Sequence, residues 1–209
     1  MMQDVNPTRA ELLVVKTRIK LAESGHKILK KKRDGLIMEF YAALKDAKNL
    51  RGELNILYQK AHLSMIETTA LEGVTEIKSL SLALKDRPSV DLEIRNVMGV
   101  KIPQIKKGKI RKSMEERGYG LLSSSMRMDE MAQNYEELLE KALDVAEVET
   151  KLRRLLIEIE KTKRRVNSLE YIVIPRLDEQ RRFIAMRLEE MDRETTFRMK
   201  KIKQRMQTA

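Results

Sequence analysis

The sequence predicts a mainly α-helical protein. In it, a long N-terminal helix and a long C-terminal helix form an antiparallel two-helix coiled coil, with a small β-hairpin and a loop inserted between them. Charged residues make up 36% of the 209 residues and aromatic residues only 4%, which is typical of long helices that bury a thin seam. Apolar residues recur every three or four positions at both ends of the chain. Between these ends, Gly, Pro and Ser concentrate, and one stretch alternates with a period of two.

The N-terminal helix is expected to run from about Thr8 to about Lys85. Two start signals overlap. Asn6 can cap the helix with Pro7 in its first position, or Thr8 can cap it and form a Thr-x-x-Glu capping box with Glu11. Steps of three and four residues then alternate without a skip, which is a strong coiled-coil signal. The expected seam contains Leu12, Ile19, Leu29, Leu36, Phe40, Leu50, Leu54 and Leu57.

The C-terminal helix is expected from Met126 to Met206, because this stretch has no Gly and a single proline, Pro175. Proline lacks a backbone N–H, so we expect a bend or a local loosening near the carbonyl of Tyr171. One alignment of the two helices places Gly35 near Pro175 and predicts a hinge there. The expected seam contains Leu138, Leu152, Leu156, Ile159, Val166, Leu169, Val173, Leu177, Ile184, Leu188 and Met191.

Two helices of nearly equal length can pair within one chain or between two chains through identical seams. We favour the intramolecular antiparallel pair, because the connecting segment gives the two ends a high effective concentration. His26 and Arg33 fall on the N-terminal seam, where a polar residue either fixes the register or contacts an outside partner. The chain therefore divides into an N-terminal coiled-coil helix (1–80), an insertion (81–125) and a C-terminal coiled-coil helix (126–209).

The insertion carries the strand signals. Apolar and charged residues alternate over residues 90–95, which predicts a strand. Residues 97–100 predict a turn, and a return strand follows with Pro103 in an edge position, so that the hairpin spans about 89–105. An isolated hairpin is marginally stable in water, so this one is expected to lean on the helices or on a partner. Residues 106–125 are predicted to form a mobile loop.

The net charge of +11 comes from the two ends of the chain, where the excess of Lys and Arg lies in residues 1–33 and 164–209. Basic helix ends can meet nucleic acid, an acidic membrane surface or acidic protein walls, or they can simply keep the helices solvated. An alternative function is therefore a basic coiled-coil protein that binds nucleic acid or acts as a scaffold. The small number of aromatic residues, and the acidic residues interleaved in the basic stretches, weigh against a nucleic-acid-binding function.

The residues predict no catalytic, cofactor-binding or metal-binding site. The chain has no Cys, and His26 and His62 lie far apart in the sequence, so a metal site is not expected. Gly108 and Lys109 lack the earlier Gly of a phosphate-binding loop, and the serines at 123–125 have no nearby base. No apolar run approaches the roughly 18 residues of a membrane span. We therefore expect a soluble, non-enzymatic interaction protein.

Three groups of motifs follow one another in the sequence. They are Asn6-Pro7-Thr8-Arg9 with Leu12, Lys16-x-Arg18 and Gly25-His26-x-x-Leu29-Lys30-x-Lys32-Arg33-Asp34; then Val97-Met98-Gly99-Val100-x-Ile102-Pro103; and finally Thr162-x-x-Arg165-Val166-Asn167-x-Leu169-Glu170 with Ile174-Pro175 and Glu189-Glu190. Their order, their spacing and the total length resemble the D subunit of the archaeal A-type and eukaryotic vacuolar-type rotary ATPases over essentially the whole chain.

This resemblance implies a non-catalytic central-stalk rotor subunit of a proton- or sodium-coupled rotary ATP synthase or ATPase. Such a subunit transmits torque between the membrane rotor ring and a catalytic head of three A and three B subunits, which make or hydrolyse ATP. The implied partners are the A and B subunits, the F subunit of the stalk, and the C subunit, which is called d in the vacuolar enzymes. The resemblance implies no cofactor, no nucleic acid and no membrane insertion, and a place on the cytoplasmic face of the membrane. Candidate contacts with the head are Arg9, Lys16, Arg18, His26, Lys30, Arg33, Arg165, Arg181, Arg182 and Arg198.

Overall fold

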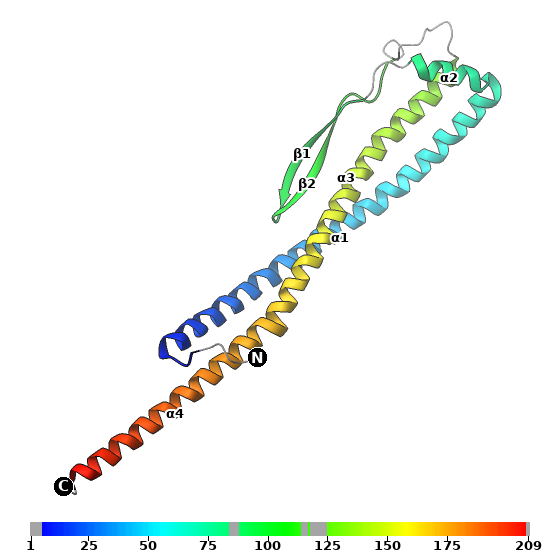
Figure 1. The fold of residues 1–209 in the computed structure, drawn as a ribbon. Coiled ribbons are helices and arrows are strands. Elements are labelled where there is room, and N and C mark those ends of the chain that lie inside the picture. Colours follow the sequence, from blue (N-terminus) through cyan, green and yellow to red (C-terminus); the bar gives the residue numbers. More distant parts are fainter. Residues whose placement is uncertain (1–5, 84–87, 114–116, 118–124, 208–209) are drawn as a thin grey trace. The chain divides into compact units, whose positions relative to one another are not determined.

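Long helical segments form both ends of the chain, and a two-stranded antiparallel sheet lies between them in the sequence. The computed structural model describes residues 6–83, 88–113, 117 and 125–207. The elements follow in the order α1 (Arg9–Glu72), α2 (Val74–Ala83), β1 (Val90–Val97), β2 (Val100–Lys107), α3 (Met126–Ser168), the π-helix η2 (Leu169–Val173) and α4 (Ile174–Gln207) (Figure 1). These elements confirm the predicted fold class.

The contacts group the chain into two compact units. Unit 1 consists of Met1–Gly35 and Ile159–Ala209, and unit 2 consists of Leu36–Glu158. Each unit therefore contains part of α1 and part of the C-terminal helical region. The two units group residues that contact one another, whereas the three segments predicted above are continuous stretches of sequence. The boundaries of those segments therefore stay a prediction.

The first turn of α1 is capped by Thr8. The backbone N–H of Glu11 donates a hydrogen bond to Thr8 Oγ1 at 3.1 Å, and the N–H of Leu12 donates to the Thr8 carbonyl at 3.0 Å. A side-chain oxygen at this position satisfies one of the N–H groups that have no partner within the helix. Of the two overlapping start signals, the structure therefore uses the one at Thr8.

The other end of α1 lies at Gly73, well before the expected end at Lys85. Gly73 has a φ of 90°, a left-handed conformation that glycine adopts without a steric penalty. Its N–H donates to the carbonyl of Thr69 at 3.1 Å, as is usual for a glycine that terminates a helix. The expectation of one helix to Lys85 is therefore wrong, because the chain turns at Gly73 and continues as the short helix α2.

In unit 1, α1 packs antiparallel against α4. The core consists of Val15, Ile19 and Ile184, and partly buried leucines surround it: Leu12, Leu177 and Leu188. Burying an Ile or Val side chain completely stabilises a fold by roughly 1.5–3 kcal/mol. Arg9 near the start of α1 forms an ion pair with Asp192 in α4 at 3.2 Å, which fixes the opposite direction of the two helices.

The loosening predicted at Pro175 takes the form of the π-helix η2. The N–H of Ile174 donates to the carbonyl of Leu169, five residues earlier, instead of to the fourth. The ring of Pro175 crowds the carbonyl one turn before it, which belongs to Tyr171 inside this segment. A wider π turn is one way in which a helix accommodates such a disruption, so the prediction is confirmed.

The proposed alignment of Gly35 with Pro175 is wrong. His26 Nε2 lies 3.4 Å from Glu170 Oε2 in η2. In an antiparallel pair, moving from His26 toward Gly35 corresponds to moving from Glu170 toward lower residue numbers, and hence away from Pro175. The error has a physical cause, because alignments that differ by whole heptads keep both apolar seams matched.

In unit 2, α1 and α3 also run antiparallel. Three contacts set their register: Lys151–Glu39 at 3.8 Å, Lys141–Glu53 at 2.9 Å, and Tyr135 OH to Met65 Sδ at 3.0 Å. The hydrogen bond and the charge of Glu53 raise the pKa of Lys141. Exposed pairs of this kind contribute little to stability. The buried residues of this pair supply most of it, and they include Leu36, Ala43, Ala61, Thr68, Met128, Asn134, Val145 and Leu155.

The hairpin has a two-residue loop, Met98-Gly99, with φ angles of 51° and 84°. Two central residues with positive φ match the right-handed twist of the flanking strands. Val97 pairs with Val100, so that Ile94 faces Pro103. Because hydrogen-bonded and non-hydrogen-bonded pairs alternate from the loop onward, Pro103 occupies a position that needs no N–H for the ladder.

Strand β2 lies against α3, whereas β1 is exposed from Val90 to Asn96. The N–H of Ile105 points out of the ladder and donates to Glu147 Oε2 at 3.0 Å, and the side chains of Val100 and Ile102 are buried. Leu92 and Ile94 of β1 are 67% and 72% exposed. The hairpin therefore leans on a helix of its own unit through one strand only.

Most of the predicted seam residues are buried or half-buried. The buried ones are Ile19, Leu36, Val166 and Ile184. The half-buried ones are Leu12, Leu29, Phe40, Leu50, Leu54, Leu57, Leu138, Leu152, Ile159, Leu169, Val173, Leu177 and Leu188. Leu156 and Met191 differ, because they are 46% and 43% exposed.

The structure buries Leu155 in place of Leu156. Leu155 is 0% exposed, and Thr162, one heptad later, is 2% exposed. Steps of three and of four residues point to either side of the same helix face, so spacing alone does not choose between two adjacent leucines. Thr162 was not predicted either, because a seam defined by apolar residues leaves out a threonine. In the structure this residue is buried on the same helix face as Leu155.

The two leucines offer a direct comparison. Leu155→Ala should lower the free energy of unfolding by about 2–5 kcal/mol, since it opens a cavity at a fully buried site. Leu156→Ala should cost less than about 1 kcal/mol, because the side chain is already largely in water. Urea unfolding followed by circular dichroism measures both values, and equal losses would contradict the placement of the seam.

Candidate functional site

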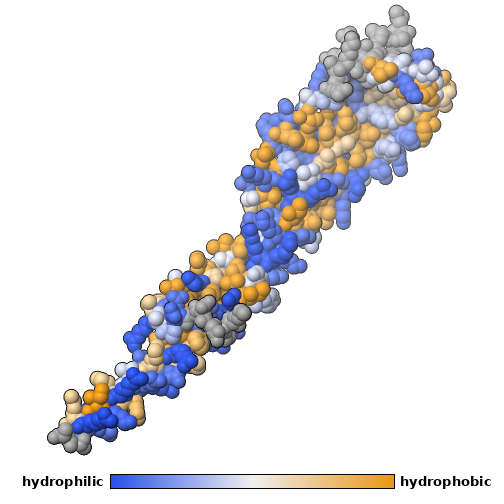
Figure 2. Space-filling view, viewed as in Figure 1, coloured by the Kyte–Doolittle hydropathy of each residue, from blue (hydrophilic) through white to orange (hydrophobic). Residues whose placement is uncertain are grey.

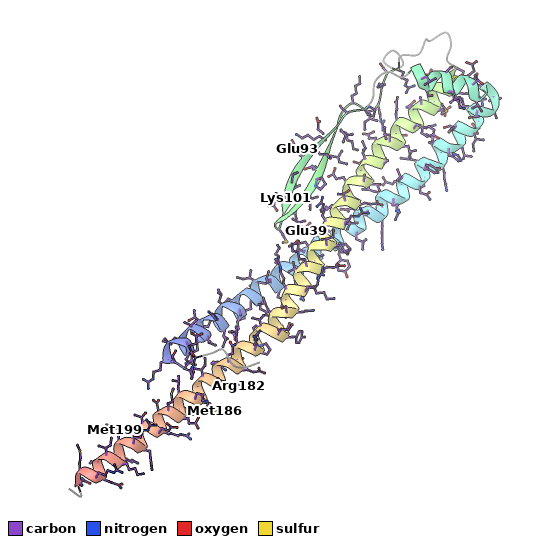
Figure 3. All side chains as sticks on the ribbon, viewed as in Figure 1. Glu39, Glu93, Lys101, Arg182, Met186 and Met199 are labelled. Carbon is purple, nitrogen blue, oxygen red and sulfur yellow. The ribbon has the colours of Figure 1, made fainter. Side chains whose placement is uncertain are left out.

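The last turns of α4 form an exposed helix at the end of unit 1. Asp192 of α4 forms an ion pair with Arg9, near the start of α1. Every residue from 191 to 207 is exposed. Met199, Ile202 and Met206 are spaced along one side of this helix, and Met199 extends from it into open space in Figure 3. We call residues 193–207 the exposed end of α4.

Basic residues accompany this apolar stripe. The exposed end of α4 carries Arg193, Arg198, Lys200, Lys201, Lys203 and Arg205, against the single acid Glu194. Figure 2 shows hydrophobic and hydrophilic surface side by side at this end of α4. A helix whose apolar stripe lies in water gains stability from a partner that covers it. Such a partner would need an apolar wall with acidic groups beside it.

His26 lies inside the helix pair of unit 1. Its side chain is 18% exposed, and Nε2 lies 3.4 Å from Glu170 Oε2 without a hydrogen bond. This position favours the interpretation of His26 as a polar seam residue over that of an outward contact. Arg33 is half-buried and forms an ion pair with its neighbour Asp34 at 2.8 Å.

All ten candidate contacts with a catalytic head fall in unit 1, but the structure does not gather them into one site. The exposed ones are Arg9, Lys16, Arg18, Lys30, Arg165, Arg182 and Arg198. Arg181 is half-buried and pairs with Asp178 at 3.1 Å, and Arg198 pairs with Glu194 at 3.4 Å. These residues spread positive charge over unit 1 and do not converge on one point. Such a distribution suits a long-range electrostatic attraction to an acidic partner.

One face of α3 in unit 2 holds the segment that follows the hairpin. This face carries the acidic residues Asp129, Glu136, Glu137, Glu140, Asp144 and Glu147. Lys107 pairs with Asp144 at 2.6 Å, and Arg111 pairs with Glu140 at 3.0 Å. The N–H of Lys112 donates to Glu136 Oε2 at 3.3 Å.

We call the contacts of Lys107, Arg111, Lys112 and Arg117 with α3 the clamp. Arg117 is its buried member. Its side chain is 6% exposed and lies 3.3 Å from Asp129 Oδ1 and 3.1 Å from Glu136 Oε2. Ile110 is buried as well. Lys107, Arg111, Lys112 and Arg117 thus contact α3. The mobile loop expected at 106–125 stays a prediction, and residues 114–116 and 118–124 lie outside the described residues. The match of basic loop residues to an acidic helix face was the signal that sequence reasoning missed.

A groove of about 670 Å³ lies between α1 and α3 in unit 2. Its lining includes Leu54 and Tyr58 of α1 and Leu138 and Ala142 of α3. The ring of Tyr58 stacks on that of His62, with centroids 5.7 Å apart. The groove is the one surface described here that combines a concave shape with apolar side chains from two helices, and neither its position nor its lining was predicted.

The described part of the chain lacks the features of a metal site and of a membrane-spanning helix. No group of His, Asp and Glu residues there has a geometry that would hold a metal ion. Likewise, none of the described helices is long and apolar enough to cross a membrane. The surfaces described above are the exposed end of α4, the basic surface of unit 1, and the groove and hairpin of unit 2.

Comparison with known proteins gives consistent results over nearly the full length. The protein family of the ATP synthase D subunit matches residues 11–204. The A-type ATP synthase D subunit of Methanococcoides burtonii is 52% identical over 201 residues, which cover 96% of this chain and 98% of the relative. The proteins of the same name from Methanoregula boonei and Archaeoglobus fulgidus are 50% and 49% identical, with at least 97% of each chain covered.

The clamp on α3 leads to a test at Arg117. Arg117→Met should leave two partly buried carboxylates without their cation, which costs about 3–5 kcal/mol when a buried pair is broken. We expect hydrogen exchange at the amides of Ile110 and Lys112 to become at least about tenfold faster, as this segment leaves α3.

Arg111→Met is the matched control. Arg111 pairs with acids of the same helix face but is exposed, so its loss should cost no more than about 1 kcal/mol. Amide exchange that stays slow in Arg117→Met, or that responds equally to both substitutions, would contradict the role of Arg117.

Proposed function

Because this chain belongs to the family of the ATP synthase D subunit, we propose that it is the central-stalk rotor subunit of an A-type rotary ATP synthase. In this role it transmits torque between a membrane rotor ring, driven by protons or sodium ions, and a catalytic head of three A and three B subunits. ATP is made or hydrolysed on the A and B subunits, and this chain is non-catalytic.

Antiparallel helix pairs suit a part that carries torque. Two packed helices resist twisting better than one, because a rotation of either must break the buried seam, such as the core around Ile19 and Ile184. A pair of helices also lacks three-fold symmetry. As it turns inside a ring of three equivalent sites, each site meets a different face, and such differential contact shifts a site between conformations.

The exposed end of α4 is the observation that carries the proposal. It is an exposed basic helix with an apolar stripe, and within unit 1 it continues beyond the pairing with α1. Such a helix suits insertion into the centre of a ring whose inner wall is apolar with acidic or polar groups nearby. Exposed charges attract weakly one by one and do not lock a position, which favours rotation.

The remaining surfaces are assigned to the other partners of the complex. We assign the candidate residues of unit 1, apart from the seam residue His26, to the A and B subunits, and the surfaces of unit 2 to the F subunit of the stalk and to the C subunit, which seats the stalk on the rotor ring. The chain then lies on the cytoplasmic face of the membrane as a peripheral part of the complex. The alternative is a nucleic-acid binder or a scaffold, because the basic, exposed end of α4 also suits either role.

Removal of residues 193–209 tests the role of the exposed end of α4. Because these residues follow the last described pairing with α1, the truncated chain should keep its melting temperature within a few degrees. In a reconstituted complex, ATP-driven ion pumping should fall at least severalfold, since the shaft loses its seat in the head. Leu21→Glu, an exposed position on α1 of the same unit, serves as the control. Full pumping by the truncated chain would overturn the proposal.

Ligand binding by the isolated chain separates the rotor from its alternatives. Titration calorimetry should detect no binding of ATP at micromolar concentrations, because the chain is proposed to carry no nucleotide site. Duplex DNA should bind weakly if at all near physiological salt. Tight ATP binding would refute the non-catalytic role, and DNA affinity that falls steeply with salt would support the nucleic-acid alternative.

A further inference from the structure

The groove between α1 and α3 in unit 2 has features that the chain itself does not explain. Leu54, Leu138 and Ala142 remain only half-buried along it, and the ring of Tyr58 is exposed. The hairpin does not cover them. The hairpin contacts α3 at Asp144, the segment after it contacts α3 at Glu140, and Leu138 and Ala142 each lie two positions from one of these. Residues two apart on a helix point to nearly opposite sides.

Gly52 interrupts the lining in the middle of α1. Glycine in a helix interior is destabilising relative to alanine. A Cβ atom added at Gly52 would meet nothing within 4 Å, so packing within the chain does not require the missing side chain. A missing side chain on a groove wall does, however, allow another backbone to approach more closely, since the distance between packed helices depends on the side chains at their contact.

Two cations stand beside this gap. Lys48 and Arg51 line the groove and are exposed, and neither forms an ion pair within the described part of the chain. All other named residues of the lining are uncharged. The groove thus offers apolar contact along its length and positive charge at one place, which is complementary to an apolar stripe flanked by carboxylates.

We propose that the groove is the docking site of an α-helix from another subunit of the complex, amphipathic and acidic beside its apolar stripe. The inference rests on the proposed function, because the complex supplies the partner. A third helix laid between two antiparallel helices buries its stripe against both, as in helix-in-groove recognition. A second copy of this chain is a poor occupant, since pairing the same face would bring Lys48 and Arg51 toward their own equivalents.

Gly52→Leu tests the groove, because leucine fills the gap and is a better helix former than glycine. The isolated variant should melt no lower than the wild type. Purified F subunit, purified C subunit and the A–B head are each titrated onto the full chain. We expect one of them to bind Gly52→Leu at least tenfold more weakly, and the Lys48→Glu/Arg51→Glu double variant to weaken the same partner.

Gly25→Leu is the matched control. Gly25 is another glycine inside α1 with nothing within 4 Å of its added Cβ, but it lies in unit 1 and outside the groove. Its substitution should leave the affected partner within twofold of wild-type affinity. If all three partners bind Gly52→Leu as tightly as the wild type, the groove is not a docking site. If the wild-type chain binds none of them, the proposed function itself fails.

A photo-cross-linking residue at Asn55, in the groove lining, identifies the occupant in the assembled complex. The expected product joins Asn55 to a helical peptide of another subunit that is rich in Asp and Glu. Cross-links to a second copy of this chain, to nucleic acid or to no other molecule would each overturn the assignment. The same cross-linker at Lys60, an exposed position on α1 outside the lining, should not label that peptide.

Discussion

The fold depends on the burial of an apolar seam between two helices that come from opposite ends of one chain. In unit 1 this seam is thin, with Val15, Ile19 and Ile184 at its centre. Neither helix has an apolar face wide enough for a thick core, so each is stable only while the other covers it. The charged residues around the seam stabilise the pair little, but they keep its outer surface in water. The proposed rotor function needs the same property, since a shaft holds torque only while its seam stays closed.

Local signals along the chain predicted the helices and the hairpin well. The heptad spacing predicted that Ile19 and Leu36 share one helix face, and Pro175 predicted the irregular segment at η2. Such features depend on steps of three or four residues, or on the chemistry of a single residue. The end of α1 was harder, because a glycine inside a helical pattern is often tolerated. At Gly73 the left-handed backbone decides the matter, and the sequence does not display a φ angle.

Features that depend on long-range pairing escaped prediction. The register of the two helices is one of them, because seams that slip by a heptad still match, and the contact of His26 with Glu170 settles it. The clamp of Arg117 on Asp129 and Glu136 is another, since basic loop residues and an acidic helix face have many ways to pair. The groove near Gly52 became visible only when two helices were placed side by side. The same holds for function. The sequence motifs indicated the family, whereas the candidate partner surfaces depend on how the helices pack.

The pairing of the chain's own two ends in this register is the central claim, and cross-linking of cysteine pairs tests it most directly. The chain contains no cysteine, so pairs can be introduced into a clean background. His26→Cys with Glu170→Cys should form a disulfide within a single chain under mild oxidation, whereas Gly35→Cys with Arg176→Cys should not. Efficient bridging of the second pair, or bridging of the first pair only between two chains, would contradict the account.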